Sequence, residues 1–197
     1  MLNFRFRTEC NRGCRDERTG ERLIYLDVET QRTAASVGGW DKLDKLGVSV
    51  AVTYSPKLYE LKIFAEHNLD ELSAILHEAD TVVGYNVIDF DFKVLQGYKQ
   101  ADVSNLHVFD LMLEIQKALG HRLPLSNLRA ATLGYAPQYD ALDMVKFWVL
   151  GDMEKVFEGC CSDVLAMLAL HQYGITHGEV LYFAGADKRL TKLKVDW

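Results

Sequence analysis

The chain has 197 residues, of which 49% are hydrophobic and 25% are charged, with a formal net charge of −6 and a pI near 5.5. This length and balance predict one globular domain over residues 1–197 with a sizeable core. The negative charge argues against a protein that coats duplex DNA by charge alone, because such proteins are basic.

No apolar run reaches the length of a membrane span, and the opening MLNFRFRTEC lacks the apolar core of a signal peptide. We therefore expect a cytoplasmic protein with no membrane association. The arginine-rich segment 4–22 favours a solvated strand and turn, with a phosphate-contacting arm as the alternative. The cysteines have poor spacing for zinc and are expected to be reduced structural thiols: Cys10, Cys14, Cys160 and Cys161.

Period-two patterns and glycine-rich punctuation predict an antiparallel meander of three strands at the start of the chain. Strand and helix patterns then alternate, and two final strands form a hairpin. The predicted strands span 22–30, 48–54, 58–67, 81–86, 106–110, 179–185 and 189–197. The predicted helices span 68–79 (capped by Asn68, with Glu71 at the capping-box position), 89–100, 111–120, 126–134 (capped by Ser126), 141–151 and 152–174.

This order predicts an α/β fold of the ribonuclease-H-like architecture. Its mixed sheet would combine the antiparallel three-strand meander with parallel strands. Helices would flank the sheet, and a β-hairpin would end the chain.

Two carboxylates, Asp27 and Glu29, interrupt the apolar run of the first strand. Side chains at i and i+2 share a strand face, so the two acids lie roughly 7 Å apart. A solvated strand end or a turn cap would explain an isolated pair. Divalent cations such as Mg²⁺ or Mn²⁺ would also explain them, provided that other parts of the chain supply further oxygen ligands.

Two more acids stand in apolar settings and could supply those ligands. Asp91 lies between two phenylalanines at the start of a predicted helix, and Asp163 lies inside the last long helix. An aspartate is uncommon in an apolar helix interior, because it favours caps. Asp89 is expected only to complement the positive helix end. The unexplained acids share one economical explanation, which is convergence on a pair of metal ions.

The motifs LDVET, GYNVIDFDFKVL and CCSDV resemble, in this order, the three motifs of the DEDD 3′–5′ exonucleases. GYN followed by FDF is similar to the second exonuclease motif of family B DNA polymerases. Segments such as VGGWDKLDKLGVSVAVTY and LSNLRAATLG resemble a stand-alone or helicase-associated exonuclease family with the ribonuclease-H-like fold. The resemblance covers nearly the whole chain from Arg22 onward.

This resemblance implies a two-metal hydrolase of phosphodiester bonds at the 3′ end of single-stranded nucleic acid, with DNA favoured over RNA. Two Mg²⁺ or Mn²⁺ ions would activate a water and stabilise the leaving 3′-oxygen. It further implies a possible helicase or nuclease partner. The implied metal ligands and catalytic residues are Asp27, Glu29, Asp91 and Asp163, and the implied substrate-contacting residues are Thr30, Asn86 and Phe90.

The third motif departs from the family at one position. Where the family has a tyrosine four residues before the last aspartate, or a histidine in a sister group, this chain has Gly159. Glu158 is expected to point away, and Tyr135, His171 or Tyr173 could reach the site in space. If the position is empty, replacing Gly159 by tyrosine should raise turnover.

The departure leaves two functions open. One is an active exonuclease whose metals carry most of the chemistry. The other is a degenerate exonuclease that binds a nucleic-acid 3′ end beside a partner. The four retained acids favour the first, because clustered acids without metal would destabilise the fold.

Overall fold

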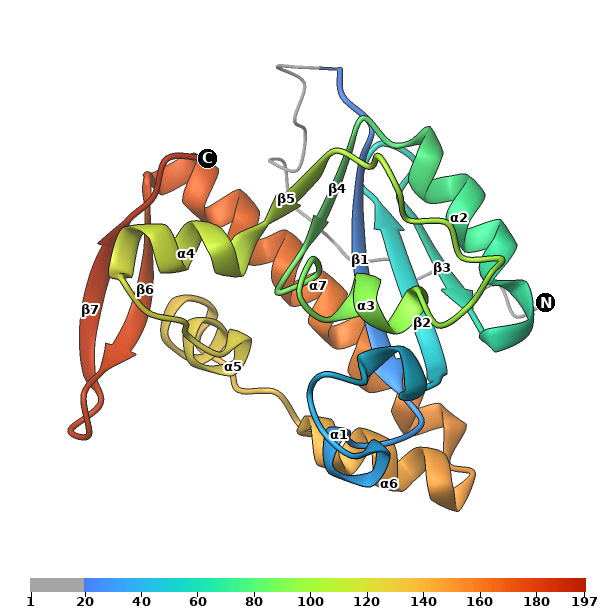
Figure 1. The fold of residues 1–197 in the computed structure, drawn as a ribbon. Helices are drawn as coiled ribbons and strands as arrows, with labels where there is room; N and C mark the ends of the chain where they lie inside the picture. Colours follow the sequence, from blue (N-terminus) through green and yellow to red (C-terminus); the bar gives the residue numbers. More distant parts are fainter. Residues whose placement is uncertain (1–19) are drawn as a thin grey trace.

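The computed structural model describes residues 20–197 (Figure 1), so Cys10, Cys14 and most of the arginine-rich segment lie outside the described residues. Its main sheet has five strands in the order β3-β2-β1-β4-β5, and a second sheet pairs β6 with β7. The strands are β1 (Leu23–Thr30), β2 (Val48–Ser55), β3 (Glu60–Phe64), β4 (Thr81–Gly84), β5 (Val108–Asp110), β6 (Glu179–Ala184) and β7 (Arg189–Lys194).

The strand directions confirm the predicted architecture. β1, β2 and β3 form the antiparallel meander, and β4 and β5 continue the sheet parallel to β1. β1 is thus the central strand. It pairs with β4 only over residues 23–25, whereas its pairing with β2 continues to Thr30. The far half of β1 therefore has one sheet edge without a neighbouring strand, and this part carries Asp27 and Glu29.

Helices cover both faces of the sheet (Figure 1). One hydrophobic cluster joins Leu26 and Val28 of β1 to α2, and another joins Tyr25 of β1 to α7. Within residues 20–197, no helix is both long and apolar enough to cross a membrane. The helices are α1 (Ala34–Val37), α2 (Leu69–Glu78), α3 (Asp91–Leu95), α4 (Leu111–Leu119), α5 (Leu125–Leu128), α6 (Ala141–Leu150) and α7 (Met153–His177), with 3₁₀ turns η1 (Leu43–Lys45) and η2 (Glu66–Asn68).

Several predicted helix ends differ from the structure. The helix expected over 89–100 is only the short α3: residues 87–90 form a turn before it, and residues 96–100 form turns after it, where Gly97 packs against the backbone of Asp44. Asn68 does not cap α2, since its side chain accepts a hydrogen bond from the amide of Ala65 in the preceding turn. Ser126 lies inside α5 and is not its cap, and a π-helical segment η3 (Arg129–Leu133) directly follows.

The C-terminal hairpin holds the α5–η3 segment in place. The side chain of Asn127 donates to the carbonyl of Phe183 at 2.9 Å and accepts from the amide of the same residue at 2.8 Å. The hydroxyl of Thr132 makes the same pair of bonds with Leu181. Two side chains therefore satisfy backbone groups of β6, and they fix the orientation of the segment that carries Arg129.

Candidate metal centre

Three carboxylates from two elements meet at one point. Oxygen atoms of Asp27 and Glu29 on β1 and of Asp163 on α7 all lie within 4.8 Å of one another. The two β1 acids share the strand face that packs on α7, and α7 brings Asp163 to them. A bulge between Glu29 and Thr30 shifts the pairing with β2 at this point, and bulges of this kind re-aim side chains beside functional sites.

The fourth predicted acid lies next to this group rather than inside it. Asp91, at the first position of α3, is 4% exposed, and its Oδ1 accepts a hydrogen bond from the amide of Val28 at 2.8 Å. Val28 stands between Asp27 and Glu29 in the part of β1 that β4 does not reach. Asp91 thus takes the place of a missing strand partner, and its charge acts on both Asp27 and Glu29.

The electrostatics show how costly this arrangement is without a cation. Burial, followed by the charge of Asp163, raises the pKa of Asp27 from 3.8 to about 7, although the thiol of Cys160 opposes this by donating to Oδ2 at 3.1 Å. Burial and the neighbouring carboxylates raise the pKa of Glu29 and of Asp91 well above their ordinary values. Asp27 and Glu29 are half-buried and lie within the pairing of β1 with β2, so they do not form a solvated strand end.

The donor set fits divalent cations such as Mg²⁺ or Mn²⁺. Hard carboxylate oxygens are the ligands that these ions take in proteins, and oxygens within 4.8 Å of one another are close enough to share one ion. A bound cation would also offset the desolvated charge that raises the pKa of these acids. Asp27, Glu29 and Asp163 would hold such an ion, with Asp91 placed to contribute to a second.

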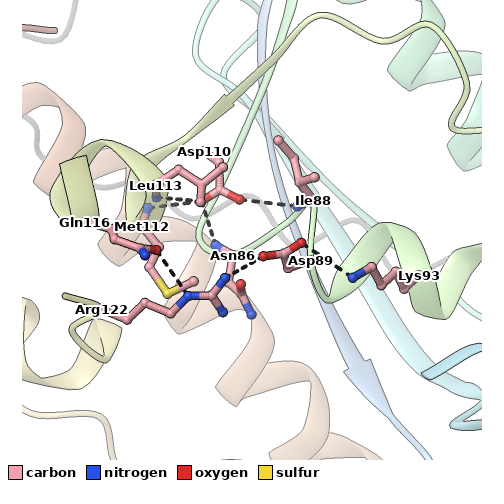
Figure 2. Close-up of polar contacts among 9 residues, drawn as sticks. All are labelled: Asn86, Ile88, Asp89, Lys93, Asp110, Met112, Leu113, Gln116 and Arg122. Atoms are coloured by element: carbon pink, nitrogen blue, oxygen red, sulfur yellow. Dashed lines mark hydrogen bonds and ion pairs between the residues drawn. The ribbon is translucent and has the colours of Figure 1, made fainter. Parts of the chain in front are cut away.

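A network around Asp110 shapes the turn between β4 and α3 (Figure 2). The carboxylate of Asp110 accepts hydrogen bonds from the amides of Asn86 at 2.8 Å and Ile88 at 3.2 Å. It also caps α4 by accepting from Met112 and Leu113. One buried side chain thereby fixes both the turn that precedes Asp91 and the start of the next helix.

Asn86 has the backbone conformation and the free acceptor of a functional turn residue. Its φ of 65° lies in the left-handed region, which asparagine tolerates better than most residues. Its side-chain Oδ1 is buried and has no hydrogen-bond partner among the described residues. Asp89, two residues before Asp91, instead forms ion pairs with Arg122 and Lys93 at the surface (Figure 2).

The other two predicted substrate residues are Thr30, the last residue of β1, and Phe90, which directly precedes α3. Thr30 is 7% exposed, and its hydroxyl donates to the carbonyl of Arg32, so it shapes the turn that leaves β1. Phe90 is half-buried, with its ring centroid 6.5 Å from that of Trp40. Trp40 is 74% exposed, which places an accessible aromatic surface beside Phe90.

A cavity of about 140 Å³ opens beside the acidic group and includes Glu29, Asp163 and Gly159 in its wall. Gly159 does not leave an empty space there, because Met144 of α6 packs directly against it. Glu158 is exposed and also borders this cavity, and the expectation that its side chain points away stays a prediction. Glu158 and Gly159, which are consecutive on α7, therefore border the same cavity.

The tyrosines and the histidine considered as substitutes lie elsewhere. His171 hydrogen-bonds the hydroxyl of Tyr25 at 2.7 Å, two turns beyond Asp163 on α7. Tyr173 stacks on His177. Tyr135 lies beneath the guanidinium of Arg129, 4.7 Å from it. None of the three is part of the cavity wall.

Arg129 is the site residue that the sequence motifs did not reveal. Its side chain is 4% exposed, and its guanidinium pairs with Asp163 and hydrogen-bonds the hydroxyl of Ser162. The charge of Arg129 lowers the pKa of Asp163, but burial outweighs it and the net shift is upward. An arginine between Leu128 and Ala130 in an apolar helix was the available signal, of the same kind that singled out Asp163.

Comparison with solved structures shows the fold. The chain is similar to the family B DNA polymerase from the hyperthermophilic archaeon Pyrobaculum calidifontis, with a TM-score of 0.60 and 14% sequence identity over 79% of this chain. The match covers 24% of that polymerase, so the chain corresponds to about a quarter of its length. No family model and no curated protein matches the sequence.

Proposed function

We propose that this protein is a metal-dependent 3′–5′ exonuclease that hydrolyses the terminal phosphodiester bond of single-stranded nucleic acid. The observation that carries the proposal is the meeting of Asp27, Glu29 and Asp163 within 4.8 Å, beside a cavity. Divalent cations bound there would supply Lewis-acid chemistry for phosphodiester hydrolysis. The order of the three acidic motifs supports a nuclease over other metal-dependent hydrolases.

The chain's own residues have distinct roles in this proposal. Cys160 holds the Asp27 carboxylate by a thiol hydrogen bond, and the Val28 amide holds Asp91. Asn86 keeps the turn before Asp91 in its left-handed conformation, while Phe90 and the exposed Trp40 offer ring surfaces on which a base can stack. The similarity to a family B polymerase agrees with the resemblance of GYN and FDF to the second exonuclease motif of those enzymes.

A second function follows from the ion pair between Arg129 and Asp163. This arginine already neutralises one metal ligand, and Gly159 supplies no side chain to orient an attacking water. A protein that grips a 3′ end without cleaving it, beside a helicase or nuclease partner, would keep the same cavity. The raised pKa values of the other acids favour the exonuclease, because those acids lack a protein counter-ion of their own.

One assay separates the two functions. Single-stranded DNA and RNA, each labelled at the 5′ end, are incubated with the protein in Mg²⁺, Mn²⁺ or EDTA. The exonuclease is expected to produce a ladder that shortens from the 3′ end only with metal, and a 3′-blocked substrate should stay intact. Degradation in EDTA, or of the blocked substrate, would contradict the proposal. Metal-dependent binding without a ladder would favour the binding module.

A further inference from the structure

The cavity beside the carboxylates has an unbalanced charge. Four of the described residues in its wall are acidic: Glu29, Asp140, Glu158 and Asp163. Arg129 is the only cation among the described residues of this wall. A phosphate that enters the cavity would be repelled by the acids unless cations offset them. Bound metals would supply part of this positive charge. Arg129 is the part that the cavity wall itself supplies.

Arg129 has hydrogen-bonding capacity that its protein partners do not use. A guanidinium has five N–H bonds in a planar fork, and the bonds to Asp163 and Ser162 account for two of them. Its Nε is buried and has no partner among the described residues. Unpaired buried donors are costly, and Arg129 borders the cavity, so an acceptor on a ligand there can use donor capacity that the described residues leave unused.

The side chain is also held in one orientation. It stacks over the ring of Tyr135 at 4.7 Å, and the α5–η3 segment that carries it is fixed to β6 by Asn127 and Thr132. Arg129 opens the π-helical stretch η3, and π-helical insertions are frequent at functional sites. A residue that served only as a counter-ion to Asp163 would need its charge but not this directed, pre-set fork.

We propose that Arg129 binds the scissile phosphate, which is the 5′-phosphate of the 3′-terminal nucleotide. The two ends of the fork bond different residues of α7, Asp163 and Ser162, so it can keep its bond to Ser162 while donating to a phosphate oxygen. Arginine suits this role because its planar fork matches the geometry of a phosphate. The inference rests on the proposed function for the identity of the substrate, but it can be tested without turnover.

The test compares the binding of dTMP and of thymidine at saturating Mn²⁺, by calorimetry, because the two ligands differ only in the phosphate. Wild-type protein should bind dTMP more tightly than thymidine. Arg129→Gln should weaken dTMP binding by about 10- to 100-fold, the usual loss for a hydrogen bond to a charged group, and leave thymidine binding unchanged. Its affinity for Mn²⁺ alone should be retained or increased, because Asp163 loses a competing partner.

Two further variants keep the test decisive. Arg22→Gln is the matched control, since Arg22 pairs with Asp80 at the opposite end of β1, and it should bind dTMP as the wild type does. Arg129→Lys keeps the charge but loses the fork, and it should weaken dTMP binding less than glutamine. If a thermal melt shows that Arg129→Gln is not folded, the binding of dTMP by Arg129→Lys is compared with that of the wild type instead.

The possible outcomes separate this inference from the proposed function. If Arg129→Gln and Arg129→Lys bind dTMP as tightly as the wild type, or if the wild type does not prefer dTMP to thymidine, the inference is overturned. If the wild type prefers dTMP through Arg129 but forms no 3′ ladder, phosphate binding stands and the exonuclease assignment fails. Equal loss of dTMP, thymidine and Mn²⁺ binding would show that Arg129 only maintains the fold.

Discussion

Met144 of α6 occupies the space beside Gly159 of α7. A β-carbon at position 159 would lie 2.5 Å from both Sδ and Cε of this methionine, and the ring of Tyr139 follows at 3.8 Å. Met144 is 2% exposed and belongs to the core between α7 and the sheet. The small size of Gly159 therefore leaves room for Met144. A tyrosine at this position would not fill an empty space, because Met144 already occupies it.

We expect Gly159→Tyr alone to lower the melting temperature and not to raise turnover, because the ring must displace a buried thioether. Combining it with Met144→Ala should restore part of the stability, since the smaller side chain opens the space. The double-mutant cycle should show a favourable coupling of about 1–3 kcal/mol. Strictly additive effects in urea unfolding would show that the two positions do not compete.

Asp27→Asn should have opposite effects with and without metal. In EDTA at pH 8 it should stabilise the protein, on the order of 2 kcal/mol, because it removes a buried charge beside Asp163. In wild-type protein, Mn²⁺ should raise the melting temperature by binding the folded state. The variant should lose most of that rise. A variant that is less stable in EDTA, or that keeps the full response to Mn²⁺, would contradict the metal centre.

The metal-free protein should become more stable as the pH falls from 8 toward 5. The folded-state pKa of Asp27 is about 7, against an ordinary 3.8, so the folded state binds more protons than the unfolded state between these values. The stability that this proton contributes is complete below about pH 3.8 and is lost as the pH rises through 7. Urea unfolding in EDTA at several pH values measures the slope.

Mn²⁺ should reverse this trend, because the ion must displace protons from its ligands and binds more tightly as the pH rises. Asp27→Asn supplies the control, since its slope in EDTA should be shallower than that of the wild type. A wild-type protein whose stability in EDTA rises between pH 5 and pH 8 would mean that the pKa of Asp27 is not raised in the folded state.

Asp110→Ala should be among the most destabilising single changes outside the acidic group. It removes the acceptor for the amides of Asn86, Ile88, Met112 and Leu113 (Figure 2). We expect a loss of about 3 kcal/mol, which combines a lost helix cap with unsatisfied buried amides. Asp102→Ala, which removes a surface carboxylate bonded to Ser104, should cost about 0.5 kcal/mol or less. Comparable losses in urea unfolding would contradict the assigned role.

The sequence was sufficient for the sheet because short apolar runs mark β1, β2 and β4, and because glycines and a proline separate the strands of the meander. It was also sufficient to single out the four acids, since a charge in an apolar run needs a partner. Helix ends were less predictable. The segment 89–100 has a helical pattern throughout. The residues just before it nevertheless form a turn, because the amides of Asn86 and Ile88 donate to Asp110, more than twenty residues further along the chain.

The contacts of Gly159 and Arg129 could not be predicted for a similar reason. Whether Gly159 faces open space depends on Met144, fifteen residues earlier on another helix. The π-helical geometry of η3 has no local signature in the letters RAATL, which also suit an ordinary α-helix. Sequence periodicity reports which face of an element is buried, but not which side chain of another element fills the space opposite.

The bond between the Val28 amide and Asp91 makes one backbone proton a direct reporter of the site. Neighbouring amides of β1 are bonded to other strands, whereas this one is bonded to a carboxylate whose electron density changes when it loses a proton or gains a cation. In a two-dimensional NMR spectrum, the Val28 cross-peak should therefore move during a titration with diamagnetic Mg²⁺, while that of Tyr25 stays nearly still. The pairing of β1 with β4 ends at Tyr25, three residues before Val28, so the Val28 amide is left to bond a side chain. The sheet therefore contains a probe that reports whether the metal site is occupied.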